Sequence, residues 1–165
     1  VEASAVSSNL SESVPQELPV EIQNVGFDFK VTCYKERQKS PLMRELTMQA
    51  HDVFAREEDS NNFNSFKTWW ENICEITESC SRWEFIVTHD RSPVIGVVAQ
   101  VVPDIHYGKI VHAVWTYVVP KYRNPQSLRF VRKFLGDLSE MVGARAFFRT
   151  SRLERGFFRL KYTEV

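Results

Sequence analysis

The sequence predicts an α/β fold in which a central mixed β-sheet carries helices on both faces. Residues 111–119 are apolar at nearly every position, as expected for a strand buried on both sides in the middle of a sheet. A helix should follow, because Asn124 is a good N-cap, Pro125 suits the first turn, and apolar residues recur at helical spacing up to Gly143: Leu128, Val131, Leu135, Leu138 and Val142. Residues 144–150 are again strand-like, so we expect a right-handed βαβ unit with two parallel strands.

The spacing of apolar residues also predicts the helices and strands that precede this unit. Residues 25–35 alternate apolar and polar side chains, which indicates a first strand with one wet face. Two helices come next, one from Ser40–Pro41 onward with Leu42, Leu46, Ala50, Val53 and Phe54, and one over about 65–77 with Phe66, Trp69 or Trp70, Ile73 and Ile76. Beyond Ser81 the period is that of strands, and two hairpins lead antiparallel into the central strand. The predicted order is β-α-α-β-β-β-α-β with a short terminal segment.

One domain should account for most of the chain. Its 165 residues, 43% of them hydrophobic, suffice for one core and are too few for two ordinary domains. Residues 1–20 are rich in Ser and Glu and lack aromatic residues, so we expect a flexible tail before a single domain at 21–165. Three cysteines without a CxxC pair predict neither a disulfide framework nor a metal site.

Charge is divided unequally along the chain. Residues 1–80 hold 14 acidic and 7 basic residues, and residues 81–165 hold the reverse. The halves should attract each other within the fold, while the basic C-terminal region and the tail could contact protein partners. A nucleic acid is the less favoured partner, because paired phenylalanines beside the arginines also suit a core. No run of about 20 apolar residues and no signal peptide is present, so we expect no membrane span and an intracellular location.

The segment YVVPKYRNPQSLRFVRKFL (117–135) resembles the strand-four to helix-three region of GCN5-related N-acetyltransferases (GNATs), and ERGFFRLKY (154–162) resembles the late helix of that family. The predicted order of elements is also similar. The resemblance implies that the strand around Val118 and Val119 splays from its neighbour. Its backbone would receive the pantetheine arm of acetyl-CoA, and the following turn would hold the pyrophosphate.

The pyrophosphate motif of that family is incomplete here. Free N–H groups at a helix N-terminus bind anions, and small residues let the phosphates approach. Arg123 matches the first motif position, but Gln126 and Leu128 stand where small residues are expected, and Pro125 lacks an amide hydrogen. Helix capping alone also explains this stretch. If the site is active, its cofactor residues are Val118, Val119, Arg123, Asn124, Gln126, Ser127 and Leu128.

Candidate catalytic groups are few. Amine acetylation needs a base for the amine proton and an acid for the leaving thiolate. His112 on the central strand and Glu84 are candidate bases, although a core histidine and a solvated strand glutamate are the simpler interpretations. The position that matches the family's tyrosine acid is Phe157, so Tyr162 is the candidate acid, and Tyr122 is an alternative; either would need a geometry that differs from the family's.

Two hypotheses follow. The preferred one is a GNAT-like fold with a decayed site and no cofactor, acting as a binding or structural component rather than an enzyme. Degenerate domains of this fold occur in tailed-phage virions, so a virion is an alternative to the cytoplasm. The rival is an active N-acyltransferase using acetyl-CoA, with an acceptor that the sequence does not define. Hydrolase, nucleotidase and metalloenzyme motifs are missing from the sequence.

Overall fold

The computed structural model describes residues 26–40, 42, 45–46, 51, 65–154 and 157–165. The predicted tail at 1–20 and most of the first predicted helix lie outside these residues. Within that helix, four described residues are helical, and two of them are fully buried: Leu42 and Leu46. Among the described residues, no helix is long and apolar enough to cross a membrane.

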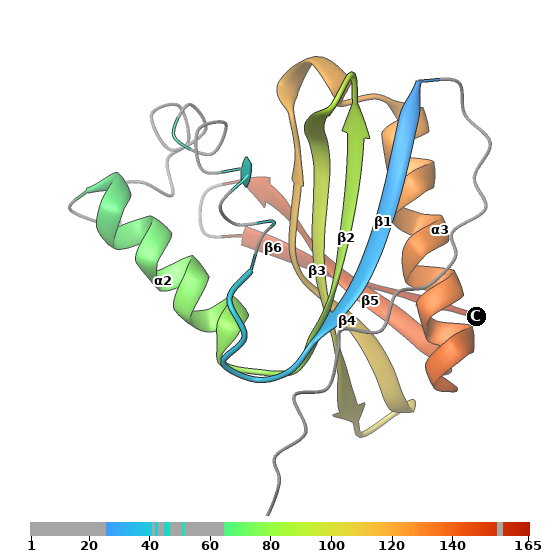
Figure 1. The fold of residues 1–165 in the computed structure, drawn as a ribbon. Helices are drawn as coiled ribbons and strands as arrows, with labels where there is room; N and C mark the ends of the chain where they lie inside the picture. Colours follow the sequence, from blue (N-terminus) through green and yellow to red (C-terminus); the bar gives the residue numbers. More distant parts are fainter. Residues whose placement is uncertain (1–25, 41, 43–44, 47–50, 52–64, 155–156) are drawn as a thin grey trace, which may run out of the picture.

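A six-stranded sheet forms the centre of the molecule (Figure 1). Its strands lie side by side in chain order, and every neighbouring pair is antiparallel except β4 and β5, which are parallel. This confirms the predicted mixed sheet and the predicted surroundings of the central strand. The strands are β1 (Phe27–Tyr34), β2 (Arg82–His89), β3 (Ser92–Asp104), β4 (Gly108–Val118), β5 (Ala146–Glu154) and β6 (Phe157–Glu164).

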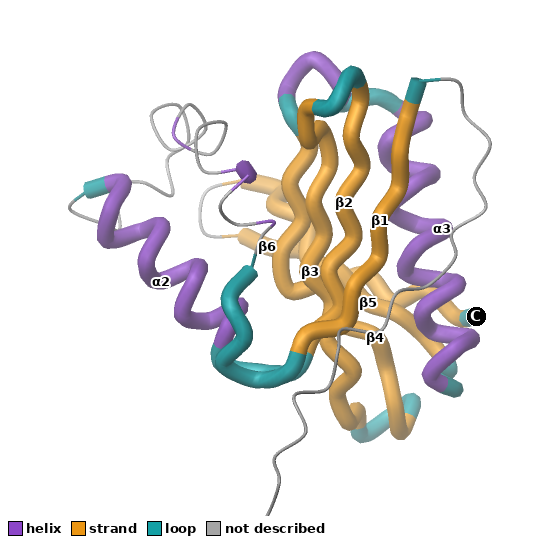
Figure 2. The backbone as a smooth tube through the Cα atoms, in the orientation of Figure 1, coloured by secondary structure: helices purple, strands orange, loops and turns teal. Residues whose placement is uncertain are grey.

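Two helices, α2 (Phe66–Glu78) and α3 (Pro125–Val142), lie on opposite sides of the sheet (Figure 2). The ends of α3 are those that the sequence predicts. The side chain of Asn124 accepts a hydrogen bond from the Ser127 amide, and Gly143 ends the helix with a φ of 65°, where glycine carries no steric cost. A short 3₁₀ turn, η2 (Pro120–Tyr122), connects β4 to α3.

The face of the sheet under α3 holds the larger apolar core. Phenylalanine, leucine and valine side chains of α3 pack there against alternate residues of β2 and β3, including Phe85, which stacks on Phe134 at 4.7 Å between ring centroids. Leu128 was expected in this stripe, but 36% of it is exposed. The buried face of α3 is formed by other residues: Ser127, Phe130, Val131, Phe134, Leu135, Leu138 and Ser139.

A smaller apolar cluster occupies the opposite face, under α2. Trp70, Ile73 and Cys74 of that helix pack against it, and Thr77 is its one buried residue. Ile76 was predicted to belong to the apolar stripe but is 50% exposed, because the helix turns the face through Thr77 toward the sheet. The core of this cluster is Leu42, Leu46, Ile86, Val98 and Tyr117.

The C-terminal segment differs from the expectation drawn from the family. Residues 154–162 resemble a late helix, yet most of them form strand β6, which pairs antiparallel with β5. Glu154 is paired with Phe157, so only two residues connect the strands. A helix has no room in such a connection, and the family's late helix is therefore replaced by a hairpin.

Candidate functional site

Strands β4 and β5 pair at one end and separate at the other. The parallel pairing covers only Ile110–Ala113 of β4 and Ala146–Arg149 of β5. Beyond it, β4 pairs with β3 alone and β5 with β6 alone. The splay that the family resemblance implies around Val118 is present in this chain.

A β-bulge in β4 marks the point of separation. Val98 of β3 pairs with Trp115, and the next residue, Ala99, pairs with Ala113, so Val114 has no partner opposite it. An extra residue bends its strand and increases the twist. It also exchanges the faces: Val111 and Ala113 belong to the core under α3, whereas Trp115 and Tyr117 pack on the side of α2. The side chains of β4 therefore stop alternating regularly between the two faces at Val114.

Most backbone amides of the turn after β4 are used within the chain. The amides of Tyr122 and Arg123 donate to Val119 and Pro120 at 2.8 and 3.2 Å. Farther on, the amides of Asn124, Ser127 and Leu128 also have acceptors inside the turn or the first turn of α3. Pro120 and Pro125 carry no amide hydrogen. Few donors of this turn are left for a pyrophosphate.

Arg123 is exposed, and its guanidinium makes a hydrogen bond within the chain. Its Nε donates to the carbonyl oxygen of Val118 at 3.0 Å. That carbonyl stands at the end of the splayed strand, where the family resemblance assigns backbone contacts to pantetheine. Arg123, the basic side chain that matches the phosphate motif, is therefore hydrogen-bonded to the Val118 carbonyl, which the resemblance assigns to pantetheine.

The remaining predicted cofactor residues are divided between exposed and structural positions. Gln126 is exposed and Leu128 is partly exposed, so their side chains stand where the motif calls for small residues. Ser127 is buried, and its hydroxyl donates to the Tyr122 carbonyl at 2.5 Å. The residues present at this turn do not match the way a helix N-terminus holds a pyrophosphate.

His112 and Tyr162, two predicted catalytic residues, lie in one row of aromatic rings. Phe148 stands between them, stacked on His112 at 4.1 Å and on Tyr162 at 5.4 Å between centroids. Tyr107 continues the row beyond Tyr162. Burial lowers the pKa of His112, which keeps its imidazole neutral near pH 7. Burial of Tyr162 and the neighbouring carboxylate of Asp104 raise the pKa of the Tyr162 hydroxyl.

This row lies where β4 and β5 are paired, before the splay begins. His112 is opposite Phe148 in the register of the two strands, and both faces of the Phe148 ring contact another ring. The stacking also leaves no face of Phe148 open to a nucleotide base.

Glu84 is not the solvated residue that the alternation of β2 suggested. Only 1% of it is exposed, and its Oε1 accepts from Nε of Arg82, itself buried, at 2.7 Å. Burial raises the pKa of Glu84, while Arg82 and the groups around Ser40 lower it. The segment after β1 removes Glu84 from water, because Ser40 and the Leu42 backbone hydrogen-bond to its carboxyl group. A base in this position has no path to a substrate amine.

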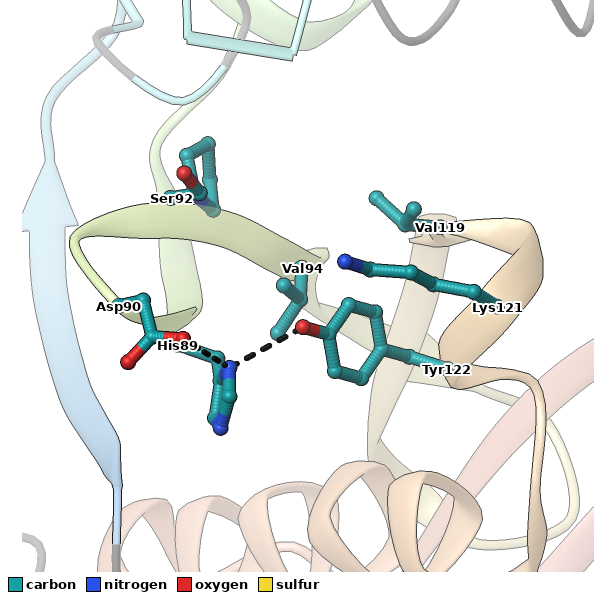
Figure 3. A pocket seen from close by; sticks show the side chains of 8 residues that line it. His89, Asp90, Ser92, Val94, Val119, Lys121 and Tyr122 are labelled. Carbon is teal, nitrogen blue, oxygen red and sulfur yellow. Dashed lines mark hydrogen bonds and ion pairs between the residues drawn. The ribbon is translucent and has the colours of Figure 1, made fainter.

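A pocket that the sequence did not indicate lies beside the same turn. Its volume is about 250 Å³, and its lining comes from the β2–β3 hairpin and from the β4–α3 connection: His89, Asp90, Ser92, Pro93, Val94, Val119, Lys121 and Tyr122 (Figure 3). Residues of α3 and β5 take no part in the lining. Nothing in the sequence places His89 next to Tyr122, because 33 positions separate them.

Comparison with solved structures supports the fold. No protein-family model matches the chain, and no curated protein matches it. An aminoglycoside acetyltransferase from an uncultured soil metagenomic sample is similar in structure, with a TM-score of 0.51 and 14% identity over 77% of this chain and 82% of that one. A possible acetyltransferase from Clostridium difficile 630 has a TM-score of 0.51 and 6% identity over 79% and 82%.

A third similar structure is a GCN5-related N-acetyltransferase from Ralstonia eutropha JMP134, with a TM-score of 0.50 and 12% identity over 78% of this chain and 86% of that chain. Likeness at such identities establishes a fold and not an activity. The chain has the fold of the GNAT acetyltransferases.

Proposed function

We propose that this chain is a non-catalytic GNAT-fold domain that binds a protein partner and does not hold acetyl-CoA at the turn between β4 and α3. The observation that carries the proposal is the internal use of that turn. Arg123 bonds the Val118 carbonyl, and the turn's amides bond its own carbonyls. To bind the amides of this turn, a pyrophosphate would have to replace hydrogen bonds that they already make, and such exchanges contribute little net free energy.

The positions of the candidate catalytic residues support the same proposal. Glu84 is buried in an ion pair, and His112 and Tyr162 stack in a row on the paired part of the sheet. A general base and a general acid must both reach the reacting atoms within hydrogen-bond distance. The hairpin β5–β6 stands where the resemblance implies a helix carrying the acid.

An active N-acyltransferase is the second candidate, and one observation favours it. The splay of β4 from β5 leaves the end of β4 unpaired on the β5 side, as a pantetheine arm would require. For this function Arg123 would have to leave Val118 and turn toward a pyrophosphate.

Thermal unfolding with acetyl-CoA separates the two functions. A ligand present at 100 times its dissociation constant stabilises the native state by about 2.7 kcal/mol, which is a shift of several degrees in a domain of this size. We expect no shift and no heat of binding at millimolar acetyl-CoA. A saturable shift would overturn the proposal.

Two matched variants show whether any binding uses this turn. Arg123→Ala removes the side chain that matches the motif, and Arg129→Ala removes an exposed arginine farther along α3. If acetyl-CoA binds through the motif, only Arg123→Ala should weaken it. The protein partners expected at the tail and at the basic C-terminal region, and a place in a virion, stay predictions.

A further inference from the structure

The pocket beside the β4–α3 connection presents hydrogen-bond donors to a space of about 250 Å³. That volume is below the range of about 300–1,000 Å³ that is usual for drug-sized ligands, so its occupant should be small. Pro93, Val94 and Val119 supply an apolar wall, while His89, Lys121 and Tyr122 supply polar groups.

The β2–β3 hairpin holds one side of this pocket rigidly. Asp90 and Arg91 form its two-residue turn, with φ values of 50° and 63°. Positive φ at both central residues is the geometry of the tight turns that match strand twist. His89 and Ser92 are directly paired across the turn, so both side chains start from fixed backbone positions.

The connection after β4 holds the other side. The amide of Val119 donates to the Val94 carbonyl at 2.9 Å, which ties the connection to β3. The ring of Tyr122 packs on Phe27 and against the core under α3. Its hydroxyl lies 3.1 Å from Nδ1 of His89, and Figure 3 shows these two groups pointing toward each other.

The tautomer of His89 determines whether the Tyr122 hydroxyl donates to it or accepts from it. Oδ2 of Asp90 lies 3.3 Å from the same Nδ1. A carboxylate only accepts hydrogen bonds, so this contact favours the tautomer in which Nδ1 carries the hydrogen. In that tautomer the one Nδ1 hydrogen is shared between Asp90 and the Tyr122 oxygen, and the Tyr122 hydroxyl hydrogen is left for another acceptor.

Lys121 adds a positive charge over the ring of Tyr122. Its Nζ lies 4.8 Å from the centre of the Tyr122 ring, an arrangement that holds the ammonium near the pocket. The ion pairs found among the described residues do not include Lys121. The carboxylate of Asp90 is 86% exposed and contacts His89, so it does not occupy the position of a ligand on Lys121.

From this arrangement we infer that the pocket binds a small oxyanion, a carboxylate or a phosphate, through Nζ of Lys121 and the hydroxyl of Tyr122. The apolar wall would accommodate a short carbon chain attached to the anion. The pocket shares Val119 with the end of β4, but no residue of β5 or α3 lines it, so it is distinct from the space between β4 and β5. It does not depend on whether acetyl-CoA binds.

The test uses the full chain labelled with ¹⁵N and titrated with sodium phosphate and, separately, sodium acetate, each at constant ionic strength set with sodium chloride. We expect saturable shifts of the amides at 89–92, 94, 119 and 121–123 with at least one of the two anions. Saturation with phosphate alone would assign a phosphate ligand, and saturation with acetate would assign a carboxylate.

Three variants decide whether the proposed groups carry the binding. Lys121→Ala should weaken it by about tenfold or more, the factor that corresponds to one hydrogen bond to a charged group, and Tyr122→Phe should weaken it severalfold. Lys161→Ala, at an exposed position of β6 on the far edge of the sheet, is the matched control and should change nothing. Arg123→Ala should also leave phosphate binding intact, which separates this pocket from the acetyl-CoA turn.

Two results would overturn the inference: no saturable shift with either anion, or equal weakening by Lys121→Ala and Lys161→Ala. Lys121 is exposed, and Tyr122→Phe retains the packed ring, so both variants should keep the wild-type melting temperature. Loss of binding in a variant that melts normally is therefore a loss of the site and not of the fold.

Discussion

The two faces of the sheet are filled in different ways. Under α3, almost every buried side chain is apolar, and two aromatic rings of β1 pack on Phe130 of α3: Phe27 at 5.7 Å and Phe29 at 5.0 Å between centroids. Under α2, the apolar cluster is smaller, and two charged side chains, Arg82 and Glu84, are buried at its edge.

The difference shows where the fold depends on directional contacts. Burial of apolar area stabilises the α3 face without requiring one particular arrangement. On the α2 face, polar groups define how the loop after β1 lies on the sheet. Arg82 donates to the Gln38 carbonyl at 2.9 Å, and Glu78 accepts from the Ser40 amide at 3.0 Å. Loss of one partner there should cost more than loss of an exposed ion pair.

Arg82→Met should give the largest effect. It leaves the Glu84 carboxylate buried without its cation, for which about 3–5 kcal/mol of unfolding free energy is the usual loss. Urea unfolding followed by tryptophan fluorescence measures it. Lys133→Met, which removes one partner of an exposed pair with Asp137, should cost well under 1 kcal/mol.

The double variant Arg82→Met/Glu84→Leu sharpens the same comparison. Replacing a buried ion pair by apolar side chains is often neutral or stabilising, so the double variant should regain most of the loss. Part of it should remain, because Arg82 also contacts Gln38 and the ring of Tyr34. A double variant as unstable as Arg82→Met would show that the charge of Glu84 is not the cause.

Two glycines test the packing of the faces. A Cβ at Gly96 in β3 would lie 2.6 Å from Leu46 and 2.7 Å from Leu42, so Gly96→Ala should overpack the α2 face at a cost of about 1–3 kcal/mol. A Cβ at Gly136 in α3 meets nothing within 4 Å, so Gly136→Ala should stabilise by about 0.5–1 kcal/mol. Chemical unfolding of both variants should show changes of opposite sign. Equal signs would contradict this description of the two faces.

How well sequence reasoning works also differs between the faces. The limits of α3 depend on residues next to each other in the chain, Asn124, Pro125 and Gly143, and they are as predicted. The burial of Glu84 depends on Ser40 and Leu42, which come from a distant segment, and periodicity within β2 gives no sign of it. The sequence also does not reveal the bulge at Val114. Both faces of β4 are apolar, so the pattern of apolar residues is the same whether or not the side chains change faces there.

The candidate site shows the same limit. The family resemblance implied the splay, and the sequence showed the incomplete phosphate motif, which concerns consecutive residues. The sequence could not predict that Arg123 turns back to Val118, since a side-chain rotamer decides that contact. It also could not predict the contact between the His89 and Tyr122 side chains, because these residues become neighbours only in the folded sheet.

Asn124→Ala tests the local character of the α3 face. It removes the acceptor of the Ser127 amide at 3.0 Å, and loss of such a cap costs typically about 1 kcal/mol. Asn124→Asp keeps an acceptor and should be close to the wild-type protein in thermal unfolding. If both variants lose equal stability, the cap is not what fixes the start of α3.

The pH dependence contributed by His112 is the smallest effect we expect, and it belongs to the α2 face. Burial lowers the pKa of this half-buried imidazole, whereas in the unfolded chain a histidine titrates near about 6.5. Just below that pH, His112 is protonated in the unfolded state but stays neutral in the folded state. The free energy of unfolding should therefore fall as the pH is lowered from about 6.5 to the depressed pKa of the folded state, and stay level above about 7.

His112→Phe keeps a ring against Phe148 and should remove this slope, as measured by urea unfolding at several pH values. His106→Gln, at an exposed position in the β3–β4 turn, should leave the slope intact. A slope that survives His112→Phe would assign the proton uptake to another group and would leave His112 as packing alone.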